Sequence, residues 1–383
     1  NILAVLVNGN SVEYALTGDR VQLILDRTPF FGESGGQIGD KGVISGNDFT
    51  VVIDGVQKEK NLFIHSGIVQ TGKLKIKDMV EAQVDIISRR RAQAHHTATH
   101  LLQSALKSVI DSSIGQRGSL VAFDRLRFDF NSPRSLNTDD LLKVENLVNR
   151  WIADNHPIVI KTMGIDEALS AGALAMFGEK YGDIVRVVDV PDVSKELCGG
   201  THVAHTSELG AFKIISEVGI SSGIRRIEAV SGQAILDYLN PRDLVVKELS
   251  HQFKAQPKDI LERVSTLQDE LKEVSSNYKN VCAEIALLKV LELRKKIITT
   301  SRSQFLVHRL DSIDGLTLQK TAKHLIDNLG QNTAVVLGGL PKPKERNKVV
   351  LVAAFGSEIL KSGLHAGKFI GPIANKCGGG GGG

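Results

Sequence analysis

The sequence has few aromatic residues, few cysteines, no long apolar run and little net charge. Aromatic side chains make up 5% of the chain, with a single Trp, so no extended aromatic stacking surface is available. No apolar run approaches the roughly 18 to 20 residues that cross a bilayer, which predicts a protein without a membrane partner. The 47 Lys+Arg and 43 Asp+Glu leave a net charge of +4, which permits a polyanionic partner without requiring one.

The cysteines argue against a disulfide framework. They are three in number and far apart, at Cys198, Cys282 and Cys377. An odd, scattered set of this kind is typical of a reducing compartment. We therefore expect a soluble protein of the cytoplasm, or of a plastid or mitochondrion if the source is eukaryotic. No pattern in the sequence indicates its oligomeric state.

The remaining composition is that of a globular protein of more than one domain. Hydrophobic residues make up 42% and charged residues 23% of the 383 residues, which predicts roughly two to three domains. The chain begins without Met and ends in six glycines at residues 378–383. These glycines are either a flexible tail or a loop that approaches a phosphate or a backbone. We expect a piece of a larger protein, truncated at both ends.

Two different periodicities divide the first 240 residues. Residues 1–88 alternate apolar and polar side chains between turn signals such as Asn8-Gly9, which predicts a β-barrel-like subdomain. After the arginines at 89–91 the period becomes helical for about 20 residues. A strand around Phe128 and a helix over 141–153, capped by Thr138 or Asp139, follow. Residues 89–240 are therefore predicted to form an α+β core.

The second part of the chain is predicted to be a helical linker followed by a small domain. Residues 241–302 are rich in Lys, Glu and Leu with apolar positions at helical intervals, which favours one or two long helices acting as a solvated spacer. Residues 303–383 alternate strands and helices, as in an α/β module. A basic loop at 342–348 is a solvated turn or a phosphate contact. The predicted fold class is α+β multidomain.

The strongest chemical signal joins two distant segments, HTATH at 96–100 and CGGTH at 198–202. His96 and His100 are four residues apart on the predicted helix, so both can reach one ion from the same face. His95 is rotated by about 100° around the same helix, so we interpret it as a neighbour of the metal site and not as a ligand. Cys198 and His202 complete a set of three imidazoles and one thiolate, which favours Zn²⁺ over Mg²⁺ or Ca²⁺. His205 is a spare candidate.

The same residues allow two other interpretations. Two helical histidines at this spacing also occur in zinc peptidases, but Thr97 stands where such enzymes place a glutamate base. A purely structural zinc is the second reading, because four protein ligands close a tetrahedron whereas hydrolytic sites keep one position for water. Spacing alone leaves an organising and a catalytic zinc both open.

Six motifs together closely resemble the alanyl-tRNA synthetase family. They are residues 33–37 (ESGGQ), 96–100 (HTATH), 115–119 (GQRGS), 178–183 (GEKYGD), 198–202 (CGGTH) and 223–229 (GIRRIEA). The resemblance covers essentially the whole chain. It implies the part of those proteins that follows the aminoacylation domain: an editing region over 1–88 and 89–240 with zinc in its core, a coiled-coil-like linker over 241–302 and a tRNA-binding module over 303–383.

The resemblance also assigns site residues. It implies that the four zinc ligands are His96, His100, Cys198 and His202, and that Thr99 and Gln116 line the editing pocket. The glycine-rich loop at residues 32–39 is implied to press its backbone against the tRNA end. Candidate substrate-binding residues are therefore Gly35, Gly36, Gln37, Arg225 and Arg226. Consecutive strand residues face opposite sides, so at most one of the two arginines should point into the site.

By the same resemblance, the full-length protein would attach alanine to tRNA(Ala), using ATP and Mg²⁺ bound by an aminoacylation domain that this chain lacks. This chain would bind tRNA(Ala), hold one Zn²⁺ and hydrolyse mischarged Ser-tRNA(Ala) and Gly-tRNA(Ala). Two alternatives stay open. One is a free-standing deacylase that edits in trans, and the other is a noncatalytic, zinc-stabilised RNA-binding module.

Overall fold

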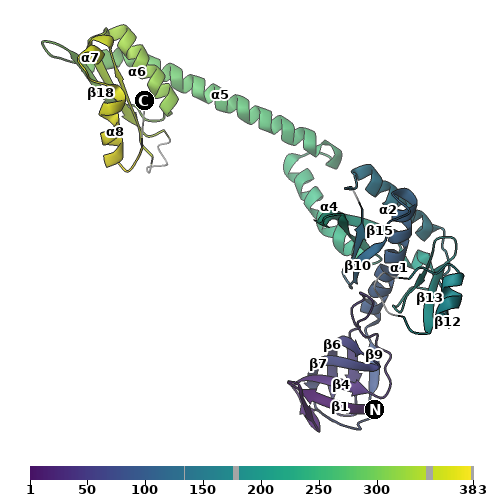
Figure 1. The fold of residues 1–383 in the computed structure, drawn as a ribbon. Coiled ribbons are helices and arrows are strands. Elements are labelled where there is room, and N and C mark those ends of the chain that lie inside the picture. The colour runs from purple at the N-terminus through teal and green to yellow at the C-terminus, as the bar shows by residue number, and fades with distance from the viewer. Residues whose placement is uncertain (133, 176–180, 342–347, 381–383) are drawn as a thin grey trace. The chain divides into compact units, whose positions relative to one another are not determined.

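The computed structural model describes residues 1–132, 134–175, 181–341 and 348–380 (Figure 1). The chain divides into two compact units, residues 1–246 and 247–383. The basic loop expected at 342–348 (Lys348 excepted), the first half of the motif at 178–183 and the last three glycines lie outside the described residues. The α+β multidomain fold class is confirmed, whereas the finer division at residues 88, 240 and 302 stays a prediction.

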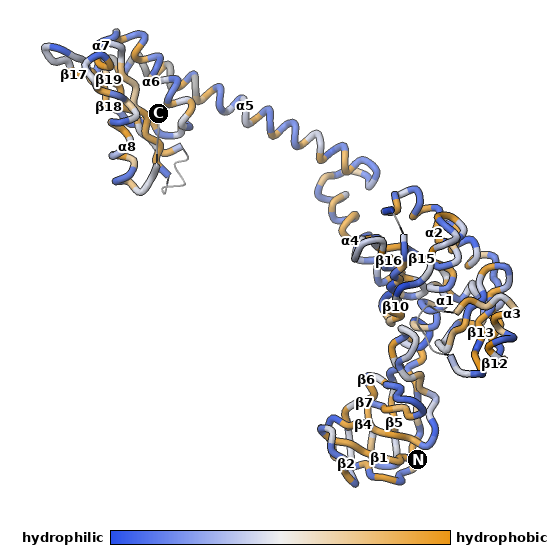
Figure 2. Tube along the Cα trace, viewed as in Figure 1, coloured by the Kyte–Doolittle hydropathy of each residue, from blue (hydrophilic) through white to orange (hydrophobic). Residues whose placement is uncertain are grey.

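An antiparallel sheet of seven strands forms the first part of unit 1, in the order β2-β1-β4-β7-β6-β5-β9. The alternation read from the sequence is present in β4, where Val21, Leu23 and Leu25 are buried. They belong to the same hydrophobic core as Val51 of β6. Apolar strand positions mark this region in Figure 2. The sheet comprises β1 (Ile2–Val7), β2 (Asn10–Val12), β4 (Arg20–Leu25), β5 (Gly42–Ser45), β6 (Thr50–Glu59), β7 (Leu62–Thr71) and β9 (Glu81–Val84), with a separate ribbon of β3 (Tyr14–Leu16) and β8 (Lys73–Lys75).

The next part of unit 1 is a four-stranded sheet covered by two helices. Helix α1 (Ile86–Val109) packs its apolar side on Phe128 and Phe130 of the sheet. Helix α2 lies beside α1. The sheet has the order β10-β11-β16-β15. Its strands and the second helix are β10 (Gln116–Val121), β11 (Leu126–Asn131), β15 (Phe212–Ser221), β16 (Ile224–Ser231) and α2 (Thr138–Ala153).

Both helices begin at a residue that the periodicity missed. Helix α1 starts before the arginines because the Asp85 side chain accepts hydrogen bonds from the backbone N–H groups of Ile87 and Ser88. The expected cap of α2 at Thr138 or Asp139 is wrong, since Asn137 occupies that position and exchanges hydrogen bonds with Asp140. Several consecutive residues here are good caps, so composition cannot choose among them.

A smaller three-stranded sheet supplies the second half of the candidate site. Strands β12 (Val159–Gly164), β13 (Ile184–Val190) and β14 (Ser194–Leu197) pair antiparallel in that order, with α3 (Ile165–Ser170) packed beside them. The chain leaves β14 directly into residues 198–202. A short 3-10 helix (Thr206–Leu209) then leads back to β15. The order of these elements places residues 198–202 against α1.

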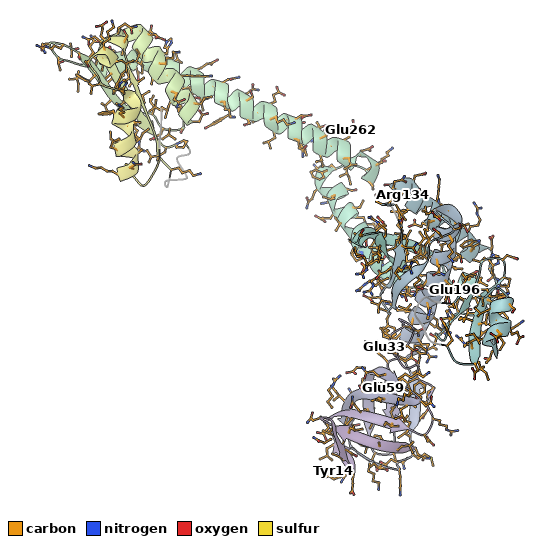
Figure 3. The ribbon with its side chains drawn as sticks, in the orientation of Figure 1. Tyr14, Glu33, Glu59, Arg134, Glu196 and Glu262 are labelled. Carbon is orange, nitrogen blue, oxygen red and sulfur yellow. The ribbon has the colours of Figure 1, made fainter. Side chains whose placement is uncertain are left out.

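The glycine-rich loop at residues 32–39 links the first sheet to the helical core. On one side the Glu33 N–H donates to the Val56 carbonyl of β6 (Figure 3). On the other side the Ile38 N–H donates to the Val121 carbonyl of β10 at 3.0 Å. Gly36 lies so close to Ser119 that a Cβ there would meet the Ser119 carbonyl oxygen at 2.8 Å. The loop therefore joins the two parts of unit 1 through backbone contacts.

Unit 2 contains the predicted small α/β module. Strands β18 and β19 are parallel, and α6 packs on the sheet, whose order is β17-β18-β19-β20. Its elements are η2 (Pro257–Asp259), α5 (Ile260–Leu293), η3 (Arg294–Lys296), β17 (Ile298–Thr299), β18 (Gln304–Arg309), α6 (Gly315–Leu329), β19 (Thr333–Gly339), β20 (Val350–Phe355), α7 (Ser357–Lys361) and α8 (Ala366–Lys376), and α4 (Ala234–Phe253) precedes them. In the described part of the chain, no helix is both long and apolar enough to cross a bilayer.

The buried histidine of β7 makes the stability of the chain depend on pH. The Nδ1–H of His65 donates to the Leu23 carbonyl, and its Nε2 accepts from Thr28. Burial lowers the pKa of His65 from its usual value of 6.5. Below pH 6.5 the unfolded chain then holds more protons, so the free energy of unfolding should fall as the pH drops below 6.5 toward the folded-state pKa. One proton limits the slope to about 1.4 kcal/mol per pH unit.

Urea unfolding followed by circular dichroism, at several pH values between about 5 and 8, measures this slope. His65→Gln should flatten it, and the exposed His251→Gln should leave it as in the wild type. Equal slopes for wild type and His65→Gln would show that His65 does not titrate in this way.

Candidate metal centre

Four buried side chains from two distant segments converge on one point in unit 1. Helix α1 carries His96 and His100, and the loop after β14 carries Cys198 and His202. Their donor atoms all lie within 4.8 Å of one another. Cys198 Sγ is 3.3 Å from Nε2 of His96 and 3.3 Å from Nε2 of His202. The structure therefore brings together the four residues that the sequence paired.

The donor set fits one zinc ion. Donors at zinc distances of about 2.0–2.3 Å stand about 3.3–3.8 Å apart on the edges of a tetrahedron, which matches the sulfur–nitrogen separations. Nε2 of His100 is buried without a hydrogen-bond partner among the described residues. A buried nitrogen in that state is costly unless something else uses it. Three imidazoles and a thiolate are ligands that zinc accepts.

The charges of the cluster favour the ligating forms of two of its members. Burial raises the pKa of the Cys198 thiol, but the neighbouring His96 and His100 lower it well below the usual value, toward thiolate. Burial and His96 lower the pKa of His202 to about 3, which keeps it neutral. For His100, burial opposes protonation, yet the charges of Glu196 and Cys198 raise its pKa. Thiolate and neutral imidazole are the forms that bind metal.

Each histidine is oriented by a hydrogen bond on the side away from the cluster. Nδ1 of His96 donates to Gln37 Oε1 at 2.7 Å, and Nδ1 of His100 donates to Glu196 Oε2 at 2.6 Å. Nδ1 of His202 donates to Thr97 Oγ1 at 3.1 Å. These bonds turn all three Nε2 atoms toward the same point. Partners of this kind fix the tautomer and ring orientation of metal-binding histidines.

Gln37 also holds in place residues 198–202, which we call the cysteine loop. Its side chain is fully buried, its Oε1 accepts from the Thr201 N–H at 2.9 Å, and its Nε2 donates to Thr201 Oγ1 at 2.8 Å. The glycine-rich loop, helix α1 and the cysteine loop therefore meet at one amide group. The predicted contact of Gln37 with the substrate stays a prediction. The structure shows it in contact with His96.

The cysteine loop needs glycine at one of its two glycine positions. A Cβ on Gly200 would lie 2.0 Å from Cε1 of His96, whereas a Cβ on Gly199 would meet nothing within 4 Å. Arg186 holds the loop from outside, donating to the carbonyls of Cys198 and Gly200 at 2.8 and 2.7 Å. Gly200 is thus required because the His96 ring fills the space beside it.

The two spare histidines lie outside this cluster. Nδ1 of His95 donates to the Ala122 carbonyl at 2.7 Å, and burial lowers the pKa of His95. His205 precedes the short 3-10 helix and forms a capping box with Glu208. The rotation of His95 around α1 that its spacing implied is therefore present in the structure.

Thr99 and Gln116 lie close to the cluster but have different surroundings. Thr99 is buried next to His100 in α1, and its hydroxyl donates to the His95 carbonyl at 2.8 Å, which leaves its lone pairs to accept. Gln116 begins β10 and donates to Ser119 Oγ at 3.0 Å. Gln116 also lines a cavity of about 120 Å³ together with Gln103 and Glu196. Their roles toward a substrate stay predictions.

The other predicted substrate residues lie in the glycine-rich loop and on β16, an inner strand of the four-stranded sheet. Gly35 is exposed with a φ of +57° and open space around it. Arg225 forms a two-point ion pair with Glu217 of β15. Arg226 pairs with Asp129 of β11 at 2.7 and 2.8 Å. Both arginines are therefore engaged with a neighbouring strand.

Sequence reasoning missed the residues that orient the ligands. Glu196 is buried, lies two residues before Cys198, and its Oε1 accepts from Ser194 Oγ at 2.7 Å. Thr97 stands at the position that excluded a peptidase and turns out to contact His202. A carboxylate close in sequence to a metal-binding cysteine was the available signal for Glu196. No local pattern could have paired Thr97 with His202.

Comparison with known proteins places the chain among the synthetases. Residues 1–88 match the model of class II (A) tRNA synthetases, and residues 185–228 match the second additional domain of threonyl and alanyl tRNA synthetases. The chain is 56% identical over its whole length to an alanine--tRNA ligase of Prochlorococcus marinus (strain MIT 9303) and 55% identical to one of Synechococcus sp. (strain WH7803). It spans 43% and 44% of those proteins.

A pair of glycine variants tests the packing of the cysteine loop. Gly200→Ala should displace the His96 ring and lower zinc affinity by more than the roughly 10- to 100-fold that loss of an outer hydrogen-bond partner costs. Gly199→Ala should bind one zinc per chain as the wild type does. Competition with a chromophoric chelator measures both affinities. Equal affinities for the two variants would contradict the close packing of Gly200 on His96.

A second test concerns the amide that orients His96. Gln37→Leu should weaken zinc binding by about 10- to 100-fold, because His96 loses the acceptor of its Nδ1–H. Gln83→Leu, at an exposed position of β9, is the control and should leave the affinity unchanged. If Gln37→Leu binds zinc like the control, the hydrogen bond to His96 does not support the site.

Proposed function

Because the chain belongs to the alanine--tRNA ligase family, we propose that it is the part of such an enzyme that hydrolyses wrongly aminoacylated tRNA(Ala). The observation that carries this proposal is the convergence of His96, His100, Cys198 and His202, each histidine with a buried partner for its outer nitrogen. Two members of the cluster, Cys198 and His202, lie in the segment matched by the second additional domain of threonyl and alanyl synthetases, residues 185–228, which runs from β13 to β16.

A second site of this kind is needed because binding alone discriminates weakly between amino acids of similar size. A pocket built for alanine rejects glycine or serine weakly, because one methylene or hydroxyl group is worth only about 1–3 kcal/mol. A separate hydrolytic site can remove the errors that result. Such a site must hold the end of the RNA, orient the amino acid and bring water to the ester carbonyl.

We assign these tasks to residues around the cluster. The lone pairs of the Thr99 hydroxyl accept a hydrogen bond from the serine hydroxyl, since its proton is already donated to His95. Gln116, whose amide lines the neighbouring cavity, positions the ester or the attacking water. The glycine-rich loop with Gly35 and Gly36 approaches the RNA backbone, and one of the paired arginines of β16, Arg225 or Arg226, contacts it.

Zinc held by the four donors would supply positive charge at this point, and such charge can lower the pKa of a bound water to about 7. Recognition of the amino acid and positioning of the ester and the RNA fall to the chain's own residues. Four protein donors also complete a tetrahedron, as in structural zinc sites, so the cluster additionally ties α1 to the cysteine loop. In either role, loss of a donor disturbs the wall of the pocket.

For the whole protein we propose the activity of the relatives: attachment of alanine to tRNA(Ala) with ATP and Mg²⁺ held in a domain outside this chain. The partner of the chain is then tRNA(Ala), correctly or wrongly charged. The bacterial relatives favour the cytoplasm as its location. The closed set of four donors favours one alternative, a zinc-stabilised module that binds RNA without hydrolysing it.

Hydrolysis of charged RNA decides between these functions. The chain should deacylate Ser-tRNA(Ala) and Gly-tRNA(Ala) but spare Ala-tRNA(Ala), and a chelator should abolish the activity. Cys198→Ala should lower the rate by about 100-fold or more, since losing a ligand exceeds the cost of losing its outer partner. Cys282→Ala, outside the site, should match the wild type.

Release of radiolabelled amino acid from each tRNA measures these rates. Full activity and a full zinc content in Cys198→Ala would show that the cluster is not the site. Binding of tRNA(Ala) without hydrolysis of any ester would favour the noncatalytic module.

A further inference from the structure

A small polar cavity lies beside α1, about one helical turn past His100 of the cluster. It has a volume of about 120 Å³. Its walls come from α1, the start of β10, the loop after α3 and β14, and they include Gln103, Lys107, Gln116, Arg117, Leu174 and Glu196. All of these residues belong to unit 1. None of the roles proposed above uses Gln103 or Lys107.

The size of the cavity limits what it can hold. Sites for drug-sized ligands and cofactors have volumes of about 300–1,000 Å³, so a nucleotide is too large for this one. A cavity of about 150 Å³ holds a molecule as small as benzene, and glycine and serine are of similar size. The cavity therefore fits a small amino acid and excludes the RNA to which that amino acid is attached.

The wall formed by the loop after α3 and by β14 is held in place by hydrogen bonds. The Leu174 N–H donates to the Lys195 carbonyl, and the Leu197 N–H donates to the Leu174 carbonyl, both at 2.9 Å. Glu196 lies between these two bonds (Figure 3), and its Oε2 accepts from Nδ1 of His100. The carboxylate of Glu196 is therefore fixed where the cavity meets the cluster.

One buried acceptor in the cavity wall has no partner. The Gln103 side chain is 7% exposed, and its Oε1 is buried without a hydrogen-bond partner among the described residues. A buried acceptor in that state is costly, so a donor supplied by a ligand is favourable there. The carboxylate of Glu196 adds negative charge to the same cavity. Together these two groups favour a ligand that donates hydrogen bonds and is positively charged, as an ammonium group is.

A positive charge lies one turn farther along α1. Lys107 is four residues after Gln103, which places it on the same face of the helix and about 6 Å farther along its axis. Its side chain is half-buried and has no ion pair within the part of the chain that the structure describes. The cavity thus offers acceptors near the cluster and a cation farther away. This arrangement matches a molecule that carries both an ammonium and a carboxylate group.

A carboxylate distinguishes a free amino acid from an esterified one. In the ester, the carbonyl carbon is bonded to a ribose oxygen and carries no negative charge. Hydrolysis bonds a water oxygen to that carbon and breaks its bond to the ribose oxygen. One proton of the water goes to the ribose oxygen, and the other is released as the new acid ionises. A cation in the cavity therefore favours the product of hydrolysis over the substrate.

We propose that this cavity receives the amino acid that hydrolysis sets free, with its ammonium group at Gln103 and Glu196 and its carboxylate at Lys107. Two residues connect the cavity to the site described above: Glu196 contacts His100, and Gln116 is the residue assigned to the ester. The amino acid then leaves along α1, where the RNA is too large to follow. The inference rests on the proposed function, because an aminoacyl ester is the source of the amino acid.

Binding of small ligands to the zinc-loaded chain without RNA tests the two charged contacts. The probes are L-serine, L-serinamide, which lacks the carboxylate, and 3-hydroxypropionate, which lacks the ammonium group. Titration followed by ligand-observed NMR measures each affinity. Lys107→Gln should weaken L-serine about 2- to 5-fold, as expected for a partly exposed ion pair, and leave L-serinamide unchanged. Gln103→Leu should weaken L-serine and L-serinamide about 10-fold or more and leave 3-hydroxypropionate unchanged.

Matched controls exclude general effects on charge or folding. Lys161→Gln removes an exposed lysine of β12, and Gln83→Leu changes an exposed amide of β9; both should bind L-serine as the wild type does. Every variant should retain one zinc per chain. Gln103→Leu should unfold at the same urea concentration as the wild type or a higher one, because it removes the buried acceptor that lacks a partner. Its loss of affinity then reports the contact with the ligand.

Inhibition of deacylation distinguishes a product from an amino acid taken up from solution. Added L-serine should slow the hydrolysis of Ser-tRNA(Ala) by the wild type, and Lys107→Gln should need about 2- to 5-fold more L-serine for the same inhibition.

Three results would overturn the inference: equal affinities of the wild type for L-serine and L-serinamide, wild-type affinity for L-serine in both cavity variants, or L-serine binding that leaves deacylation unaffected. The last result would make the cavity a site for an amino acid from solution. If L-serine binds with the expected pattern but the wild type hydrolyses no mischarged tRNA, the two charged contacts in the cavity stand and the proposed function fails.

Discussion

The structure of unit 1 depends on placing one thiol and three imidazoles together away from water. Polar groups that are buried without partners cost several kcal/mol each, so such a cluster persists only when the surroundings satisfy it. Here the outer nitrogens of the histidines are satisfied by Gln37, Glu196 and Thr97, and the inner atoms face one another. This requirement fixes how α1, β14 and the cysteine loop must meet.

The N-terminal sheet is part of this arrangement because Gln37 lies on the loop that joins it to the core. Its amide contacts both His96 and Thr201, so the position of the loop and the geometry of the cluster are linked. The same loop lines a cavity of about 340 Å³ together with Gly199 and Thr201.

Much of this was readable from the sequence where the information is local. The spacing of His96 and His100 implies one helix face, and the alternation in residues 20–25 implies a half-buried strand. Cap positions were less secure, since residues 137–140 are all favourable near a helix start and only the hydrogen bonds distinguish them. Arg225 and Arg226 were candidates for substrate, but a local pattern does not reveal the carboxylates of β15 and β11 that face them.

The sequence by itself determined the elements and the kind of ligand, because helical and strand periods, glycine turns and a histidine–cysteine set are written in consecutive residues. Only the tertiary structure decided which groups surround them. Gln37 and His96 are separated by 59 residues and Thr97 and His202 by 105, and no local rule connects such pairs. Their contacts arise from the packing of α1 between two sheets, where burial forces every polar atom to find a partner in three dimensions.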